Sequence, residues 1–157
     1  MPVTFSENLD GSGLRIAIAV SRFRSVITER MLAGALEALT ELGVDDESVT
    51  VAWVPGSFEL SFAARRFAET GKFDAILCIG CVIKGETDHN EYINNQAARG
   101  IAEMSEQLGV PTIFGVITPN NFEQALARAG EGTTNKGYEA AVTGIVMANL
   151  KKRLQDL

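Results

Sequence analysis

Four short apolar runs that alternate with helical segments constrain the fold of this chain most strongly. Each run is rich in β-branched residues and nearly continuous in hydrophobicity, which is typical of strands that are covered on both faces. Strands of this kind belong to parallel sheets with helices packed on either side. The predicted strands occupy residues 14–20 (LRIAIAV), 48–54 (SVTVAWV), 74–83 (DAILCIGCVI) and 111–117 (PTIFGVI).

Helices are predicted after each strand, because apolar residues recur there at intervals of three and four. Gly43, Gly109 and Gly130 follow three of these segments, in the position where glycine commonly ends a helix. Basic residues at positions 151–153 lie in the final turns of the last segment, where cations interact favourably with the helix dipole. The predicted helices occupy residues 26–42, 58–69, 91–108, 122–129 and 138–154.

This β-α alternation, followed by a further helix, predicts a three-layer α/β sandwich around a four-stranded parallel sheet. No linker or low-complexity tract interrupts the sequence, so we expect one domain over residues 1–157, with residues 1–13 as an N-terminal arm. Residues 3–5 are β-prone but have no obvious partner within their own domain. Since crossovers between parallel strands are right-handed, the strand-to-helix loops share one edge of the sheet, where such folds bind ligands.

Charge and composition exclude several classes of function. The formal charge of −6 argues against a nucleic-acid partner, because phosphate backbones need a basic face. No apolar run approaches the roughly 20 residues that cross a bilayer, so no membrane partner is expected. The N-terminal sequence MPVTFSENLDGSG has neither the basic nor the apolar region of a signal peptide. We therefore expect a cytoplasmic protein.

Cys78 and Cys81 form a CxxC pattern, which by itself suggests a redox pair or half of a zinc site. Both lie inside the apolar run at 74–83, and strand residues three apart point to opposite faces of the sheet. A redox CxxC normally begins a helix, and the single histidine is too little to complete a zinc site. We interpret the two cysteines as buried reduced thiols.

The four loops at the predicted ligand edge carry chemically useful residues. His89 is the only histidine, and imidazole transfers protons in both directions near neutral pH; the alternative is a surface histidine near a helix N-terminus. The turn Gly85-Glu86-Thr87 can hold an anion with free backbone N–H groups, or it can simply cap the helix through Thr87 or Asp88. The loops occupy residues 21–24, 55–59, 84–89 and 118–121.

Three further features have both a functional and a structural interpretation. Phe23 can stack on a flat heterocycle or pack onto the core beside its helix. Residues 56–59 suit a polyhydroxylated chain, or they form an ordinary capped helix start. Arg128 and Lys136 flank a Gly/Thr loop and can bind phosphate, although solvated surface charge is the commoner role of such residues. No GxGxxG or GxxxxGK[ST] motif supports dinucleotide or P-loop binding.

The loop sequences together resemble the lumazine synthase family, in family order and spacing across most of the chain. No single segment is decisive, but their combination is highly specific. The segments that carry the resemblance are SRF at 21–23, VPGSFE at 54–59, GCVIKGETDH at 80–89, FGVIT at 114–118, EQALARAG at 123–130 and NKG at 135–137.

The resemblance implies a flavodoxin-like strand order 2-1-3-4 and a defined reaction. In that reaction 5-amino-6-(D-ribitylamino)uracil condenses with 3,4-dihydroxy-2-butanone 4-phosphate. The products are 6,7-dimethyl-8-ribityllumazine, phosphate and water. The family uses no metal and no organic cofactor. The steps are Schiff-base formation, loss of phosphate, tautomerisation and ring closure.

The resemblance also assigns roles to residues of this chain. Phe23 would stack on the pyrimidine, and His89 would transfer protons. Phe114 and the Arg128 region would reach the site from a neighbouring subunit. The ribityl chain would be held by Ser57, Phe58 and Glu59, and the pyrimidine edge would meet the backbone of Cys81, Val82 and Ile83. The phosphate would be held by Glu86 and Thr87 with Arg128. The site would be completed by Phe114 and Lys136.

Self-association is the main partner prediction. A sheet of this size has exposed edges and apolar helix faces to cover, and residues 3–5 can add to a neighbour's sheet. The resemblance implies a pentamer, and the short Gly-rich segment at 130–136 favours an icosahedral shell of sixty subunits. Riboflavin synthase enclosed in such a shell is the expected protein partner.

Three positions depart from the family pattern, and two rival functions remain open. Arg24 stands where the family often has Asn, Asn90 where an aromatic residue is common, and Lys84 where Arg is frequent. An archaeal-type riboflavin synthase shares the fold but needs no butanone-phosphate site, so Thr87, Arg128 and Lys136 argue against it. A flavodoxin-like binding module needs an acidic or FMN-phosphate loop after the first strand, where this chain has SRF.

Overall fold

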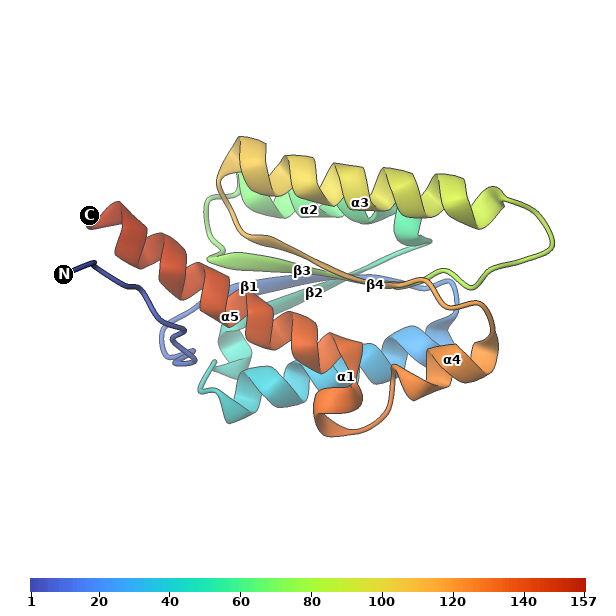
Figure 1. The fold of residues 1–157 in the computed structure, drawn as a ribbon, viewed down its shortest axis with the longest axis horizontal. Helices are drawn as coiled ribbons and strands as arrows, with labels where there is room; N and C mark the ends of the chain where they lie inside the picture. Colours follow the sequence, from blue (N-terminus) through green and yellow to red (C-terminus); the bar gives the residue numbers. More distant parts are fainter.

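The computed structural model describes residues 1–157 and shows a central sheet between two layers of helices (Figure 1). Helices α2 and α3 cover one face, while α1, α4 and α5 cover the other. The predicted three-layer α/β sandwich is therefore confirmed. The helices span Ser25–Glu41 (α1), Leu60–Glu69 (α2), His89–Leu108 (α3), Phe122–Ala127 (α4) and Lys136–Gln155 (α5).

The four strands are all parallel and follow the predicted order β2-β1-β3-β4. Ile18 of β1 lies opposite Val51 of β2 and Leu77 of β3, and Cys78 of β3 lies opposite Phe114 of β4. This order leaves β2 and β4 as edge strands, and the point at which the strand order reverses lies between β1 and β3. The strands span Ile16–Ser21 (β1), Val49–Val54 (β2), Ala75–Cys81 (β3) and Thr112–Ile117 (β4).

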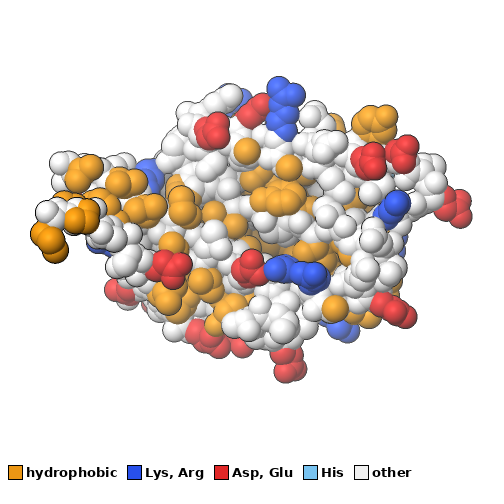
Figure 2. Space-filling model, viewed as in Figure 1, with side chains coloured by type: hydrophobic (Ala, Val, Ile, Leu, Met, Phe, Trp, Pro, Cys, Tyr) orange, Lys and Arg blue, Asp and Glu red, His pale blue; other side chains and the backbone are white.

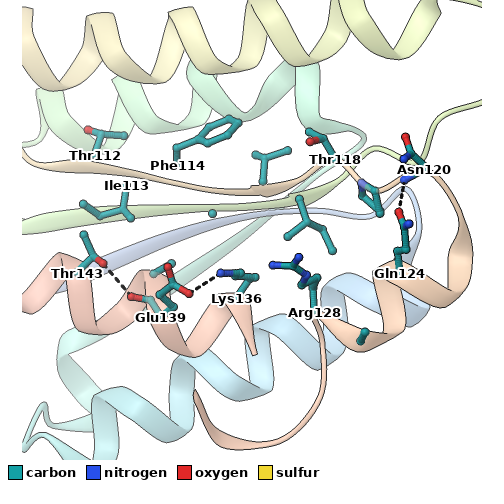
Figure 3. Close-up of a pocket in the computed structure, with 16 residues that line it drawn as sticks. Thr112, Ile113, Phe114, Thr118, Asn120, Gln124, Arg128, Lys136, Glu139 and Thr143 are labelled. Carbon is teal, nitrogen blue, oxygen red and sulfur yellow. Dashed lines mark hydrogen bonds and ion pairs between the residues drawn. The ribbon is translucent and has the colours of Figure 1, made fainter. Parts of the chain in front are cut away.

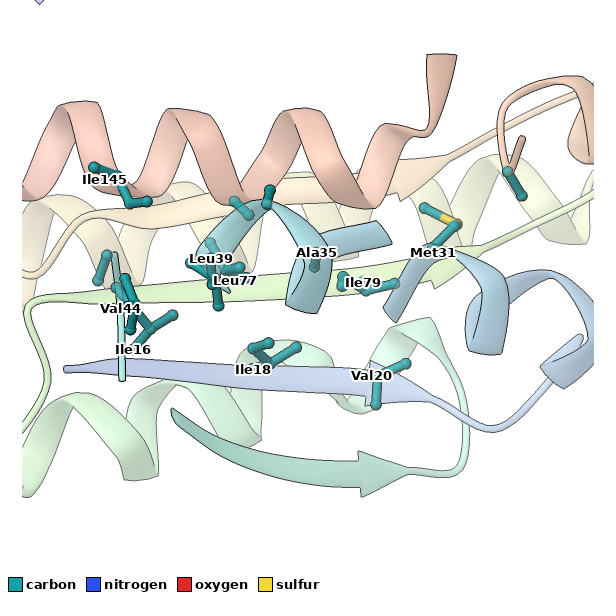
Figure 4. Close-up of a cluster of buried hydrophobic side chains, with 14 of the residues drawn as sticks. Ile16, Ile18, Val20, Met31, Ala35, Leu39, Val44, Leu77, Ile79 and Ile145 are labelled. Carbon is teal, nitrogen blue, oxygen red and sulfur yellow. The ribbon is translucent and has the colours of Figure 1, made fainter. Parts of the chain in front are cut away.

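Every residue of β1 and β3 is buried, because helices cover both faces of the two central strands. Alternate side chains supply two separate apolar clusters. The larger one packs β1 and β3 against α1 and α5 and includes Ile18, Leu77 and Ile145 (Figure 4). The smaller one packs the other face against α2 and α3 through Leu60 and Ile101. The continuous hydrophobicity of the predicted strands thus reflects burial on both sides.

Asn135 joins three separate parts of the chain through a fully paired amide. Its Oδ1 accepts hydrogen bonds from the backbone N–H groups of Gly137 (2.8 Å) and Tyr138 (3.1 Å), which caps α5. Its Nδ2 donates to the carbonyl oxygens of Arg30 (3.0 Å) on α1 and Gly130 (2.9 Å). The residue is 2% exposed. One side chain therefore fixes the start of α5, the loop before it and the surface of α1.

The same end of α5 packs closely against the backbone of α1. The Cα of Gly137 lies directly against the backbone carbonyl of Met31 on α1, where no side chain would fit. Helix α5 consequently begins at Lys136, two residues earlier than the periodicity predicts, since Asn135 and Gly137 set its start.

Other helix boundaries differ from the predictions by a few residues. Residues Ser57–Glu59 form a 3-10 turn (η2) before α2, instead of the first turn of that helix. Helix α3 begins at His89 and not at residue 91, and α4 ends at Ala127 and not at residue 129. Two further 3-10 turns span Asp46–Ser48 (η1) and Gly132–Thr134 (η3). None of the helices is long and apolar enough to cross a membrane.

The N-terminal arm runs along the C-terminal half of α5 (Figure 1). Asn149 Nδ2 donates to the carbonyl oxygens of Asn8 and Asp10, both at 2.9 Å, and Arg153 donates to that of Ser6 at 3.0 Å. The Arg153 guanidinium also lies 4.8 Å from the ring centre of Phe5. Residues 3–5 form no strand within this chain, so their addition to a neighbour's sheet stays a prediction.

Replacing Asn135 with alanine is expected to lower the free energy of unfolding by about 2–4 kcal/mol. The replacement removes a helix cap and leaves buried backbone groups without a hydrogen-bond partner. Urea denaturation followed by circular dichroism measures this. Asn121 is the matched comparison, since it caps α4 from an exposed position through one hydrogen bond to the Gln124 N–H. Asn121→Ala should cost only about 1 kcal/mol. Equal losses in the two variants would show that Asn135 is no more than an ordinary cap.

Candidate functional site

A cavity of about 680 Å³ lies at the carboxyl ends of β1, β2 and β3. We call it the loop cavity, because the loops after these strands and the start of α3 form its walls. It brings together most of the residues expected to bind the pyrimidine and the ribityl chain, together with Thr87, expected at the phosphate, and His89, expected to transfer protons. Those residues are Phe23, Ser57, Phe58, Glu59, Cys81, Val82, Ile83, Thr87 and His89.

Two aromatic side chains give the loop cavity its apolar surface. Phe23 is 63% exposed and Phe58 is 56% exposed, and both line the cavity. The exposure of Phe23 disagrees with the alternative in which it packs onto the core. An exposed aromatic face beside a cavity is suited to stacking on a flat ring.

Ser57, which lines the loop cavity, has a buried hydroxyl group without a hydrogen-bond partner, and so does Ser21, which also lies close to Gly80 but outside the cavity lining. The Ser57 hydroxyl packs directly over Gly80, where a side chain would collide with it. Ser57 does not cap the following helical turn, so the capped-start alternative does not account for its hydroxyl. A buried hydroxyl without a partner is costly, and a polar ligand is one means of satisfying it.

His89 is the first residue of α3 and is exposed at the rim of the loop cavity. Its backbone N–H donates to the Thr87 hydroxyl at 3.3 Å. Asp88 makes no capping hydrogen bond with its side chain. Of the two residues expected to cap α3, Thr87 and Asp88, only Thr87 therefore accepts a hydrogen bond from the start of the helix. Glu86 is exposed and lines neither this cavity nor the one at β4.

Helix α3 contributes further cavity residues that sequence reasoning missed. Tyr92, Ile93 and Gln96 line the loop cavity together with His89. Their spacing of three, four and seven residues from His89 places them on one helix face, and this periodicity is the signal that could have found them. Asn90, noted only as a departure, also lines the cavity, and its Oδ1 is buried without a partner.

The second cavity, of about 870 Å³, lies along the edge strand β4 and is called the β4 cavity. Figure 2 shows this face with a hollow at its centre, where basic and acidic side chains lie below hydrophobic ones. The close-up in Figure 3 places Arg128 and Lys136 below the strand, whereas Phe114 points to its α3 side. Phe114 is 44% exposed.

Arg128 and Lys136 are held next to each other by the backbone. The Lys136 N–H donates to the Arg128 carbonyl oxygen at 2.8 Å, and the Lys136 ammonium pairs with Glu139 at 2.7 Å. The Arg128 guanidinium makes no ion pair within the chain. The expected site residues therefore fall into two groups within one chain. Arg128, Lys136 and Phe114 line the β4 cavity. Thr87 and Phe23 line the loop cavity.

The two cysteines point to opposite faces of β3, as predicted. Cys78 belongs to the cluster under α2 and α3, and Cys81 to the cluster under α1 and α5. Both are free thiols. Burial raises the pKa of Cys78 to about 12 and that of Cys81 to about 11, and the positive charge of Arg24 opposes the rise at Cys81. Neither thiol has the lowered pKa of a redox-active cysteine.

An open cavity beside the β1/β3 switch of a flavodoxin-like sheet defines a class of α/β proteins that bind small molecules, and this chain falls within that class. A family model described as 6,7-dimethyl-8-ribityllumazine synthase matches residues 13–152, nearly the whole chain. The chain therefore belongs to the 6,7-dimethyl-8-ribityllumazine synthase family. Its members are transferases of riboflavin biosynthesis, and the protein is an enzyme of this kind.

Alkaline pH is expected to weaken the fold through the two thiols. Above about pH 9 the unfolded thiols release protons while the folded ones retain them up to pH about 11 and 12, so unfolding becomes easier as pH rises. The free energy of unfolding should fall by about 1.4 kcal/mol per pH unit for each thiol between these limits. Urea denaturation at several pH values measures the slope. A variant with both cysteines changed to alanine should be weaker at pH 8 yet show a flatter alkaline slope; an unchanged slope would contradict the assignment.

Proposed function

We propose that this enzyme condenses 5-amino-6-(D-ribitylamino)uracil with 3,4-dihydroxy-2-butanone 4-phosphate to form 6,7-dimethyl-8-ribityllumazine, with release of phosphate and water. The family match over residues 13–152 carries the proposal. The loop cavity supports it, because it offers an aromatic face and a set of hydroxyl, amide and carboxylate groups within a volume suited to a small molecule.

In the proposed complex the pyrimidine stacks on Phe23 and its edge meets the backbone of Cys81, Val82 and Ile83. The ribityl chain extends toward Ser57, Phe58 and Glu59, which offer both donors and acceptors to its hydroxyl groups. Buried polar groups of this kind discriminate against an analogue without hydroxyls, because they would be left unpaired.

Most of the rate enhancement in this proposal comes from holding two substrates together. Schiff-base formation and ring closure are intermolecular and intramolecular attacks by nitrogen on a carbonyl carbon, and correct placement lowers the barrier to both. His89 takes and returns protons at the rim of the cavity, where it reaches solvent. Thr87, with Glu86 beside it, holds the butanone phosphate from the side of α3.

The remaining phosphate contacts require a second copy of the chain. Arg128, Lys136 and Phe114 line the β4 cavity, and β4 is an edge strand with no neighbour on its outer side. If the β4 face of one subunit adjoins the loop cavity of the next, the two sets form one site. Such a head-to-tail contact between unlike surfaces generates a closed ring, and we propose a pentamer as the functional unit.

Twelve pentamers in a shell of sixty subunits are the proposed final assembly, with riboflavin synthase as its enclosed partner and the cytoplasm as its location. The short Gly-rich segment at 130–136, which is similar to that of shell-forming members of the family, supports the shell over the free pentamer. Light scattering distinguishes the two forms, since a shell has a mass near 1 MDa and a pentamer near five chain masses. A stable, fully active monomer would contradict both.

Mixing the purified protein with the two substrates should produce lumazine fluorescence and phosphate release. His89→Ala is expected to lower turnover by roughly 100-fold, at the low end for a proton-transferring residue, because proximity supplies much of the catalysis. Binding of the pyrimidine should be largely unchanged. Asp88→Asn is the matched control, since Asp88 is exposed and lines neither cavity. Near-normal turnover of His89→Ala between about pH 6 and pH 8 would contradict proton transfer by this residue.

Arg128→Ala should raise the KM for the butanone phosphate by roughly tenfold or more, with little change for the pyrimidine, because a charge-assisted contact to phosphate is lost. Coexpression of this variant with His89→Ala then tests the shared site. In randomly mixed rings about one quarter of the sites would combine an intact His89 with an intact Arg128 from the neighbour. The mixture should therefore be more active than the mean of the two variants. Activity equal to that mean would place both residues in the site of a single subunit.

A further inference from the structure

Arg24 is the only residue other than glycine with a positive φ angle. Its backbone angles, φ 62° and ψ 43°, lie in the left-handed region. That region brings the Cβ atom of an L residue close to the following carbonyl oxygen. Asparagine, aspartate and histidine are enriched among the few side chains found there, whereas arginine is not.

The position of Arg24 at the N-cap of α1 adds two further costs. Its side chain makes no hydrogen bond to the free N–H groups of the helix, a role that serine, threonine, aspartate and asparagine perform well. Its positive charge lies at the positive end of the helix dipole, and the first turn of α1 has no acidic residue to offset it. Local structure thus disfavours arginine here on three separate grounds, and asparagine would satisfy all three.

The Arg24 side chain is directed to the loop cavity, which it helps to line. Its guanidinium carbon lies 5.4 Å from the ring centre of Phe23, and its charge acts on the Cys81 thiol. Among the residues that line this cavity it is the only arginine or lysine. It forms no ion pair and no side-chain hydrogen bond within the chain, so its donors are free.

We propose that Arg24 is a specificity-determining residue that binds the pyrimidine substrate. Its guanidinium donates hydrogen bonds to a carbonyl oxygen of the ring while Phe23 stacks on the ring face. This inference rests on the proposed function and names a contact within it. Charge-assisted hydrogen bonds are stronger than neutral ones, so Arg24 favours pyrimidinediones over rings that lack the carbonyl. The side chain lines the loop cavity close to the Phe23 ring, and this placement explains why an unfavourable residue occupies the helix start.

Arg24→Asn provides the test, with binding and stability measured on the assembled protein. Calorimetric titration of 5-amino-6-(D-ribitylamino)uracil alone should show affinity reduced by roughly tenfold or more. Binding of the butanone phosphate should stay within about twofold of wild type, which separates a carbonyl ligand from a phosphate ligand. The midpoint of thermal unfolding should rise by about 2–4 °C, because the strain and the misplaced charge are removed.

Arg22→Asn is the matched control, since it removes the same charge from the same loop. The Arg22 guanidinium lies 5.5 Å from the ring centre of Trp53, and Arg22 does not line the loop cavity. This variant should bind the pyrimidine as wild type does. Unchanged pyrimidine affinity in Arg24→Asn, a loss confined to the butanone phosphate, or a lowered midpoint temperature would each overturn the inference. A wild-type protein that binds neither substrate would instead overturn the proposed function.

Discussion

Burial of β1 and β3 on both faces is the constraint on which the rest of the structure depends. Because helices must cover each side of these strands, the chain crosses over the sheet after every strand and returns parallel to the previous one. All four carboxyl ends therefore meet at one edge. The residues that form the loop cavity are distant in sequence but follow strands that end together. The packing that stabilises the domain is also what assembles its site.

Sequence periodicity was sufficient for the sheet and its helices, because burial on two faces leaves a continuous apolar signal in β1 and β3. It misplaced the starts of α3 and α5, where local side chains decide the boundary: the Thr87 hydroxyl pairs with the first N–H of α3, and Asn135 caps α5. The loops after the strands revealed most candidate site residues. Tyr92 and Gln96 escaped notice because they lie one and two turns inside a helix, where a cavity and an ordinary surface give the same pattern. The left-handed backbone of Arg24 could not be predicted, because neither the composition of the chain nor the spacing of its residues indicates it.

The expected site residues lie in two cavities of the isolated subunit, and the two cavities differ in chemistry. The loop cavity has aromatic and hydroxyl groups but only one permanent cation, whereas the β4 cavity places Arg128 beside Lys136. The first set suits a flat ring with a polyhydroxylated chain, and the second suits an anion. In the proposed ring, association itself would bring these complementary surfaces into contact, so that catalysis would depend on protein concentration below the assembly threshold.

The hydrogen bonds that hold the arm along α5 are made to its backbone. Asn149 and Arg153 donate hydrogen bonds to the carbonyl oxygens of Ser6, Asn8 and Asp10, and the Phe5 ring adds a side-chain contact with Arg153. Carbonyl oxygens are the same in every residue type. The hydrogen bonds from Asn149 and Arg153 therefore fix the path of the arm whatever side chains it carries at those positions. This segment can accumulate substitutions, and change the chemistry that it presents outward, while it keeps its route across the helix.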